Sequence, residues 1–152
     1  MRSSHVLFVK ALLVASLCAA SSGCDEKLSS VTGPTPNLEP TIESIQAEIF
    51  TSSDSSGRTS CITCHTNAGG RVPAAGLNLS GDATRALVNV PSIQKSGSIL
   101  VIPGDPANSY LIQKIKGAGG ITGLRMPRNG PPYLTDGQVL VIERWIQLGA
   151  NQ

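Results

Sequence analysis

Aromatic side chains are scarce in this chain of 152 residues, which contains two Phe, two Tyr and one Trp. Glycine and proline are frequent, with 16 and 10 residues, and they cluster in long loop-like stretches. Such loops are uncommon in a compact domain unless they serve a function. The few apolar side chains argue against a core made of side chains alone, and they favour an interior completed by a large, flat apolar group.

An excess of either charge is also lacking. Arg2 and Lys10 lie in the N-terminal segment discussed below, which leaves ten of the twelve basic residues against ten acidic ones. A balanced chain lacks the positive footprint of a nucleic-acid-binding protein, so no nucleic-acid partner is predicted. Strand patterns are few, and no internal repeat is visible. The chain is therefore predicted to be all-α, with short helices joined by long loops.

No apolar run is long enough for a standard membrane span. The run ALLVASLCAA falls short of the roughly 20 apolar residues that cross a bilayer. It is typical of an export signal, so residues 1–23 are predicted to be a signal peptide, with a transmembrane anchor as the alternative. Ser21-Ser22-Gly23-Cys24 is similar to a bacterial lipobox, although an aliphatic residue is usual in place of Ser21. This likeness predicts a lipid anchor on Cys24; without it, the protein would be soluble and secreted.

The rest of the chain divides into a linker and one domain. Residues 24–40 are rich in Ser, Thr, Pro and charge and are predicted to be a flexible tether. Residues 41–152 form the predicted domain. Apolar residues at helical spacing predict helices at 41–50, 82–90, 106–116 and 136–148. The residues expected to cap them are Thr41, Asp82, Asp105 and Thr135.

Cysteine is scarce as well, and its placement is informative. Cys18 lies in the predicted signal peptide, and the last two cysteines stand in Cys61-Ile62-Thr63-Cys64-His65. This sequence has the C-x-x-C-H form of covalent haem attachment. Two thiols at this spacing can each bond one vinyl group of a haem, and the adjacent imidazole can bind the iron. One covalent haem c on Cys61, Cys64 and His65 is therefore predicted.

Two other chemistries use similar residues. A Cys-x-x-Cys pair can be a redox-active dithiol, or a disulfide in an oxidising compartment. However, the strand–helix alternation of thioredoxin-like proteins is lacking. Zinc needs four ligands, whereas the residues at Cys61 to His65 supply three at most. A thiol–disulfide protein without haem remains the alternative.

Histidine and methionine occur only twice each, which limits the choice of a second axial ligand. His5 and Met1 belong to the predicted signal peptide. A bis-histidine site within the mature chain is therefore excluded, and Met126 is the remaining thioether. Met126 lies in a Gly- and Pro-rich loop that can fold over the opposite haem face; the alternative is a methionine that fills a gap in the core. Met/His ligation raises the reduction potential of a haem.

Residues from about Thr41 to Ala150 resemble a single-haem cytochrome c domain of the class I type. The likeness consists of an N-terminal helix, Cys-x-x-Cys-His, a downstream Met-Pro and a C-terminal helix ending in Trp-Ile-x-x-Gly-Ala. The phrases GLNLSG, IPGDPANSYL and RMPRNGPPYLTDGQVLVIERWIQLGA are similar to those of bacterial envelope cytochromes. The resemblance implies a cytochrome c-like fold wrapped around one covalent haem, in which the first and last helices cross.

The resemblance also implies partners for the haem and its ligand. The second ring nitrogen of His65 is expected to donate to a loop carbonyl, with Pro73 as the candidate acceptor. Arg71 and Arg85 are candidate donors to the haem propionates, although each is more often a solvated charge.

The implied function is one-electron transfer to redox partner proteins in the periplasm or cell envelope, by a carrier rather than an enzyme. Arg125 and Arg128 flank Met126, and they either steer an acidic partner or only keep the loop soluble. Peroxidase-like or sensor chemistry is the alternative if Met126 does not bind iron. Peroxidase chemistry usually needs polar distal groups, and the mature chain has no spare histidine.

Overall fold

The computed structural model describes residues 38–152, and its helices are short and joined by long loops. Within this range there is no β-sheet, and the isolated bridges pair Val88 with Val101 and Pro91 with Ile99. The predicted arrangement of helices without a sheet is confirmed for this part of the chain. The predicted signal peptide, Cys24 and most of the predicted tether lie outside the described residues. None of the helices in residues 38–152 has the length and apolar character needed to cross a membrane.

The first helix forms where its apolar spacing predicts it. It consists of α2, Ile42–Ile45, followed without a break by the π-helical turn η2, Gln46–Phe50. Thr41 is the N-cap, and its hydroxyl accepts a hydrogen bond from the Ser44 N–H at 3.3 Å. The predicted apolar face is buried and comprises Ile42, Ile45, Ile49 and Phe50.

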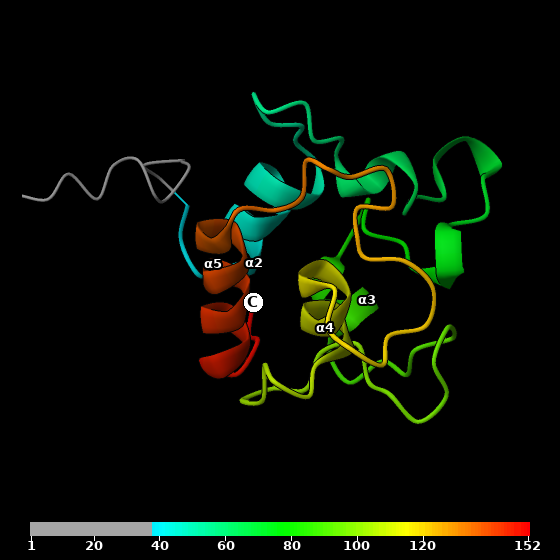
Figure 1. Ribbon diagram of the computed structural model, residues 1–152. Coiled ribbons are helices and arrows are strands. Elements are labelled where there is room, and N and C mark those ends of the chain that lie inside the picture. The colour runs from blue at the N-terminus through cyan, green and yellow to red at the C-terminus, as the bar shows by residue number, and fades with distance from the viewer. Residues whose placement is uncertain (1–37) are drawn as a thin grey trace, which may run out of the picture. The chain divides into compact units, whose positions relative to one another are not determined.

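The last helix, α5, spans Asp136–Gln147 and starts with a complete capping box. The Thr135 hydroxyl accepts from the Gln138 N–H at 3.2 Å, and the Gln138 side chain accepts from the Thr135 N–H at 3.0 Å. Val139, Ile142, Trp145 and Ile146 are buried, as predicted. Figure 1 shows α5 beside α2, so the first and last helices are in contact.

The helix predicted at 82–90 is shorter than expected. Asp82 caps α3, Ala83–Leu87, by accepting from the Arg85 N–H at 3.0 Å. The helix ends at Leu87 because Asn89 adopts a positive φ of 57° and its N–H bonds the Val101 carbonyl at 2.9 Å. The segment after Leu87 therefore pairs with another loop instead of extending the helix.

The helix predicted to start at Pro106 starts later. Helix α4 spans Tyr110–Lys116, with Ser109 as its N-cap. Asp105 is not the cap, because its carboxylate closes a separate turn by accepting from the Asn108 N–H at 3.1 Å. The end at Gly117 is as predicted, and this residue adopts a left-handed φ of 70°.

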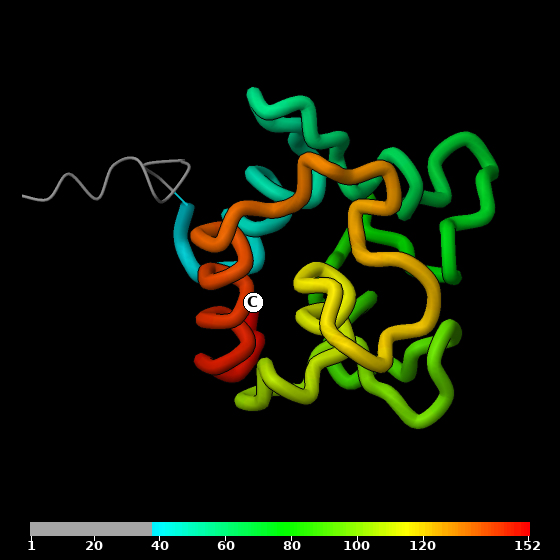
Figure 2. The backbone as a smooth tube through the Cα atoms, in the orientation of Figure 1, coloured from blue at the N-terminus to red at the C-terminus, as the bar shows by residue number. Residues whose placement is uncertain are grey.

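A single apolar cluster joins α2, α4 and α5, while 3-10 turns and loops form the rest of the domain. The short turns are η3, Cys61–Thr63, η4, Ala68–Gly70, and η5, Ala74–Gly76. In Figure 2 the orange loop that links α4 to α5 runs past the green loops of residues 65–80. These two loop regions therefore face each other next to α4.

The loop between η2 and η3 is held by a buried arginine. Arg58 is 1% exposed, and its Nε bonds the Asp54 carboxylate at 2.9 Å. The two terminal nitrogens of its guanidinium group donate to the carbonyls of Ile49, Ser52 and Thr59 at 3.3 to 3.4 Å. A buried charge needs such partners, since an unpaired one is costly. Arg58 thus fixes the loop that leads into Cys-x-x-Cys-His.

We predict that Asp54→Asn lowers the free energy of unfolding by about 2 kcal/mol at pH 7, because it leaves the Arg58 charge buried without a carboxylate. Burial raises the pKa of Asp54, but hydrogen bonds from Ser56 and Arg58 and the Arg58 charge outweigh it, so the pKa lies below its ordinary value. This stabilisation is complete above about pH 4 and is lost as the pH falls through the lowered pKa. Denaturant unfolding of both proteins from pH 7 to pH 3 measures the difference.

Asp82→Asn is the matched control. Asp82 pairs with Arg85 at 3.6 Å on the surface, and asparagine also caps helices well. This substitution is expected to change the free energy of unfolding by less than about 0.5 kcal/mol. If Asp54→Asn and Asp82→Asn have the same free energy of unfolding at pH 7, the buried Arg58 charge does not depend on Asp54, which contradicts the role given to Arg58.

Candidate functional site

The cysteine motif folds into one tight turn. Cys61 and Thr63 bound the 3-10 turn η3, and the His65 N–H bonds the Cys61 carbonyl at 2.9 Å. Both thiols are free: Cys61 is half-buried and Cys64 is exposed. The turn places Cys61, Cys64 and His65 along the wall of one cavity.

This cavity is large and mostly apolar. Its volume is about 850 Å³, which lies within the range of about 300–1,000 Å³ found for ligand and cofactor sites. Side chains from α3, α4 and α5 and from the surrounding loops line it. The apolar part of the lining includes Phe50, Leu77, Leu79, Leu100, Leu111, Ile115, Leu134 and Ile142. The side chains of the domain thus leave a wide apolar space beside two thiols and an imidazole.

His65 is held by the loop that follows it. Its Nδ1 donates to the carbonyl of Ala74 at 3.0 Å, and the Ala74 N–H donates to the Cys64 carbonyl at 3.0 Å. The acceptor is therefore Ala74, and the prediction of Pro73 is wrong by one residue. The reason is that Pro73 precedes η5 as its N-cap, and the next residue is the one fastened to the motif.

The hydrogen bond to Ala74 sets the tautomer of the His65 ring, and burial sets its charge. Burial lowers the pKa of His65, the Ala74 and Leu77 carbonyls partly oppose this, and the positive charge of Lys114 lowers the pKa further. The imidazole is therefore neutral at pH 7, and with Nδ1 protonated the lone pair lies on Nε2. A neutral imidazole with a fixed tautomer is the form that binds metals.

The two thiols have different surroundings. Burial raises the pKa of Cys61, and the charge of the nearby Arg58 opposes this effect only in part. The Cys61 sulfur also lies 3.7 Å from the carbonyl of Ile49 at the end of the first helix. Cys61 is therefore a protonated, half-enclosed thiol at neutral pH.

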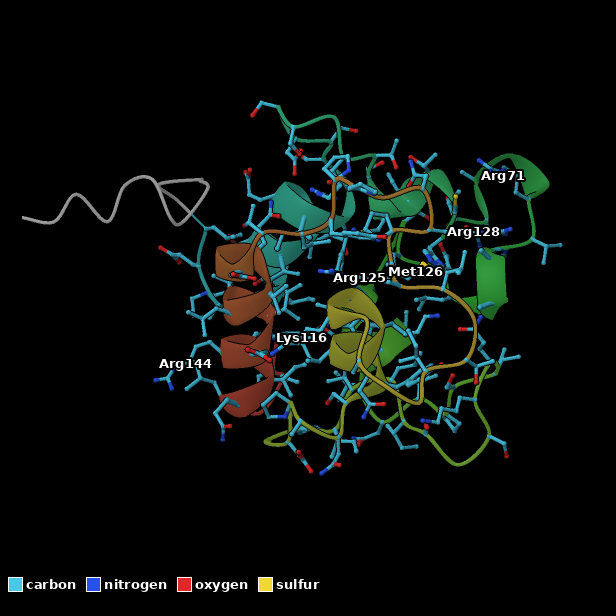
Figure 3. The ribbon with its side chains drawn as sticks, viewed as in Figure 1. Arg71, Lys116, Arg125, Met126, Arg128 and Arg144 are labelled. Carbon is cyan, nitrogen blue, oxygen red and sulfur yellow. The ribbon has the colours of Figure 1, made fainter. Side chains whose placement is uncertain are left out.

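Met126 lies in the wall of the same cavity. It is half-buried in the loop between α4 and α5, and its N–H bonds the Lys114 carbonyl at 2.9 Å. Figure 3 shows Met126 beside α4, facing the loops that follow the cysteine motif. The structure thus brings together Cys61, Cys64, His65 and Met126, although more than 60 residues of chain separate the first from the last. Cys24 lies outside the described residues.

The arginines beside Met126 differ in their roles. The Arg125 Nε donates to the Ile115 carbonyl at 2.8 Å, and its guanidinium lies 4.0 Å above the Tyr133 ring. Arg125 therefore helps to fix the loop, and its role in steering a partner or in solubility stays a prediction. Arg128 is exposed and lines the cavity.

The two arginines suggested for a propionate lie elsewhere. Arg71 donates to the Thr63 carbonyl at 3.0 Å, and Arg85 pairs with Asp82. Neither lines the cavity, so the structure does not support this suggestion. Each engages a nearby group of its own loop or helix, and a sequence pattern does not show which way such a long side chain turns.

Sequence patterns missed two buried cations next to the site, Arg58 and Lys114. Both side chains are almost fully buried, and charged residues are rarely buried unless they have partners. Their partners are mainly backbone carbonyls of loops, which leave no mark in the sequence. Lys114 stands between Ile112 and Ile115 on α4, and that position was a weak signal of burial.

The donor set suits a metal held inside an organic ring better than a bare ion. In residues 38–152, no three side chains of the His, Cys, Asp or Glu types gather where they could hold a metal ion. The cavity instead offers one imidazole and one thioether, with two thiols on its wall.

No family model matches this chain, and no curated protein and no solved structure matches it either. The function must therefore be argued from the residues around the cavity.

Proposed function

We propose that this protein is a c-type cytochrome, a one-electron carrier with one haem c bonded to Cys61 and Cys64. The single observation that carries the proposal is the apolar cavity of about 850 Å³ with both thiols, the His65 imidazole and the Met126 thioether in its lining. The resemblance to class I cytochrome c domains supports the same conclusion. The proposed fold is accordingly cytochrome c-like.

The residues present fit this cofactor. The bound haem supplies reversible one-electron redox chemistry at its iron. His65 is held by Ala74 in the tautomer that offers Nε2 to a metal, and Met126 offers a soft sulfur ligand from another loop. With a haem bound, the apolar lining would limit the access of water to the iron ligands.

Neither alternative gains a supporting observation. A thiol–disulfide protein has no use for a large apolar cavity beside its thiols. Peroxidase-like or sensor chemistry requires an open position on the iron, whereas Met126 lines the cavity. Both alternatives are nevertheless outcomes of the experiments below.

The cell envelope is the proposed location, because of the predicted signal peptide and the proposed lipid anchor on Cys24. Electron transfer there requires redox partner proteins that approach the cavity. Arg128 is exposed at the cavity lining and places a positive charge where a partner would dock. An acidic docking patch on the partner is therefore proposed.

We expect the protein, produced with a working haem-attachment system, to be red and to give a haem stain after denaturing electrophoresis. The double variant Cys61→Ala/Cys64→Ala should lose the stain completely, since no thioether bond can form. Cys24→Ala is the control: it should keep the stain and lose its association with the membrane fraction. A colourless wild-type protein would leave the thiol–disulfide alternative.

Met126→Ala is expected to remove the weak near-infrared absorption band of methionine-ligated ferric haem and to lower the reduction potential. Leu140→Ala, at a side chain of α5 that is 64% exposed and lies outside the cavity lining, is the control and should keep the band. Absorption spectroscopy of both oxidised proteins makes the comparison. A wild-type protein without the band, which binds carbon monoxide when reduced, would favour the catalytic or sensor alternative.

Arg128→Gln is expected to slow the oxidation of the reduced protein by ferricyanide, an anionic probe, by about two- to threefold at low ionic strength. The difference should vanish in about 0.5 M salt, because salt screens exposed charges. Arg144→Gln is the matched control. Arg144 is exposed on α5, and Figure 3 shows it on the side of this helix that faces away from α4 and Met126. Stopped-flow rates that are equal for both variants would remove Arg128 from the docking site.

A further inference from the structure

Lys114 is a lysine in the interior of the domain. It is 7% exposed on α4 and lines the cavity together with His65 and Met126. Lysine is almost never fully buried unless it is paired. Yet in residues 38–152 the ion pairs within 4.0 Å involve Arg58, Arg85 and Lys116, and none includes Lys114. Its charge is therefore not neutralised by a carboxylate of this part of the chain.

Two backbone carbonyls solvate the ammonium group instead. Lys114 Nζ donates to the carbonyl of Thr122 at 2.9 Å and to the carbonyl of Leu124 at 2.6 Å. Both carbonyls belong to the loop that carries Met126. Met126 follows Leu124 by two residues. Such dipoles stabilise the buried ammonium but leave its net charge of one in place.

Lys114 is the centre of a set of bonds between α4 and this loop. Its own carbonyl accepts from the Met126 N–H at 2.9 Å, so the residue binds the loop through both its side chain and its backbone. The Thr122 N–H donates to the Tyr110 hydroxyl at 3.0 Å, and Arg125 Nε donates to the Ile115 carbonyl at 2.8 Å. Together these bonds fix the backbone on either side of Met126.

The charge of Lys114 also acts across the cavity. Screening is weaker between apolar walls than in bulk water, so a net charge there acts more strongly. A positive charge at this position stabilises the state that has one more electron, and therefore it raises the reduction potential of a redox group in the cavity.

We propose that Lys114 is a positioning residue for the haem, which fixes the loop of Met126 and raises the reduction potential with its unneutralised buried charge. This inference rests on the proposed function. It adds a specific residue, outside the attachment motif and the iron ligands, that tunes the same site.

Three variants of the haem-loaded protein test this proposal by redox titration and near-infrared spectroscopy. Lys114→Gln retains a hydrogen-bond donor but removes the charge. Lys114→Arg retains the positive charge. This variant provides a second measurement if Lys114→Gln is poorly folded. Lys116→Gln is the matched control, because it removes a positive charge two residues away on the same helix, where Lys116 is exposed and pairs with Glu143 at 2.9 Å.

We expect Lys114→Gln to favour the oxidised form on the order of tenfold, a downward shift of about 59 mV for a one-electron couple. Lys114→Arg and Lys116→Gln should each shift the potential by less than a third of this amount. The Lys114→Gln spectrum should also show a weaker methionine band. If Lys114→Gln and Lys116→Gln have the same potential and the same band, the proposal is overturned, while a haem-stained protein keeps the proposed function intact.

Discussion

The structure depends on an apolar cavity that its own side chains do not fill. The cavity of about 850 Å³ lies between α4, α5 and the long loops. Cys61 and Cys64, the residues with reactive thiols, form part of its wall. An interior with so much apolar surface open to water is unfavourable, because burial of that surface drives folding. The proposed haem would fill this space, and its covalent bonds would keep it there.

Helix α4 links the two sides of this cavity. Its apolar residues join the core shared with α2 and α5, while Lys114 and Tyr110 hold the loop that carries Met126. On the other side, Arg58 holds the loop that precedes Cys61, and Ala74 holds the ring of His65. Hydrogen bonds from buried cations to loop carbonyls therefore hold these loops in place, as the hydrogen bonds of helices and sheets hold the backbone in more regular domains.

Much of this could be predicted from the sequence, because some patterns act locally. The capping box at Thr135 and the helix end at Gly117 form where the sequence indicates, and Met126 does line the same cavity as the cysteine motif. Contacts made by long polar side chains could not be predicted. The start of α4 at Tyr110 follows a turn closed by Asp105 and Asn108, and the burial of Lys114 depends on two carbonyls of the loop after the helix.

In the proposed cytochrome, the neighbouring thiols of Cys61 and Cys64 carry a porphyrin. The intact mass of the purified mature protein under denaturing conditions is the decisive measurement. We expect a mass equal to that of the processed polypeptide, with its lipid, plus one haem. A well-folded protein whose mass equals that of polypeptide and lipid alone would contradict it.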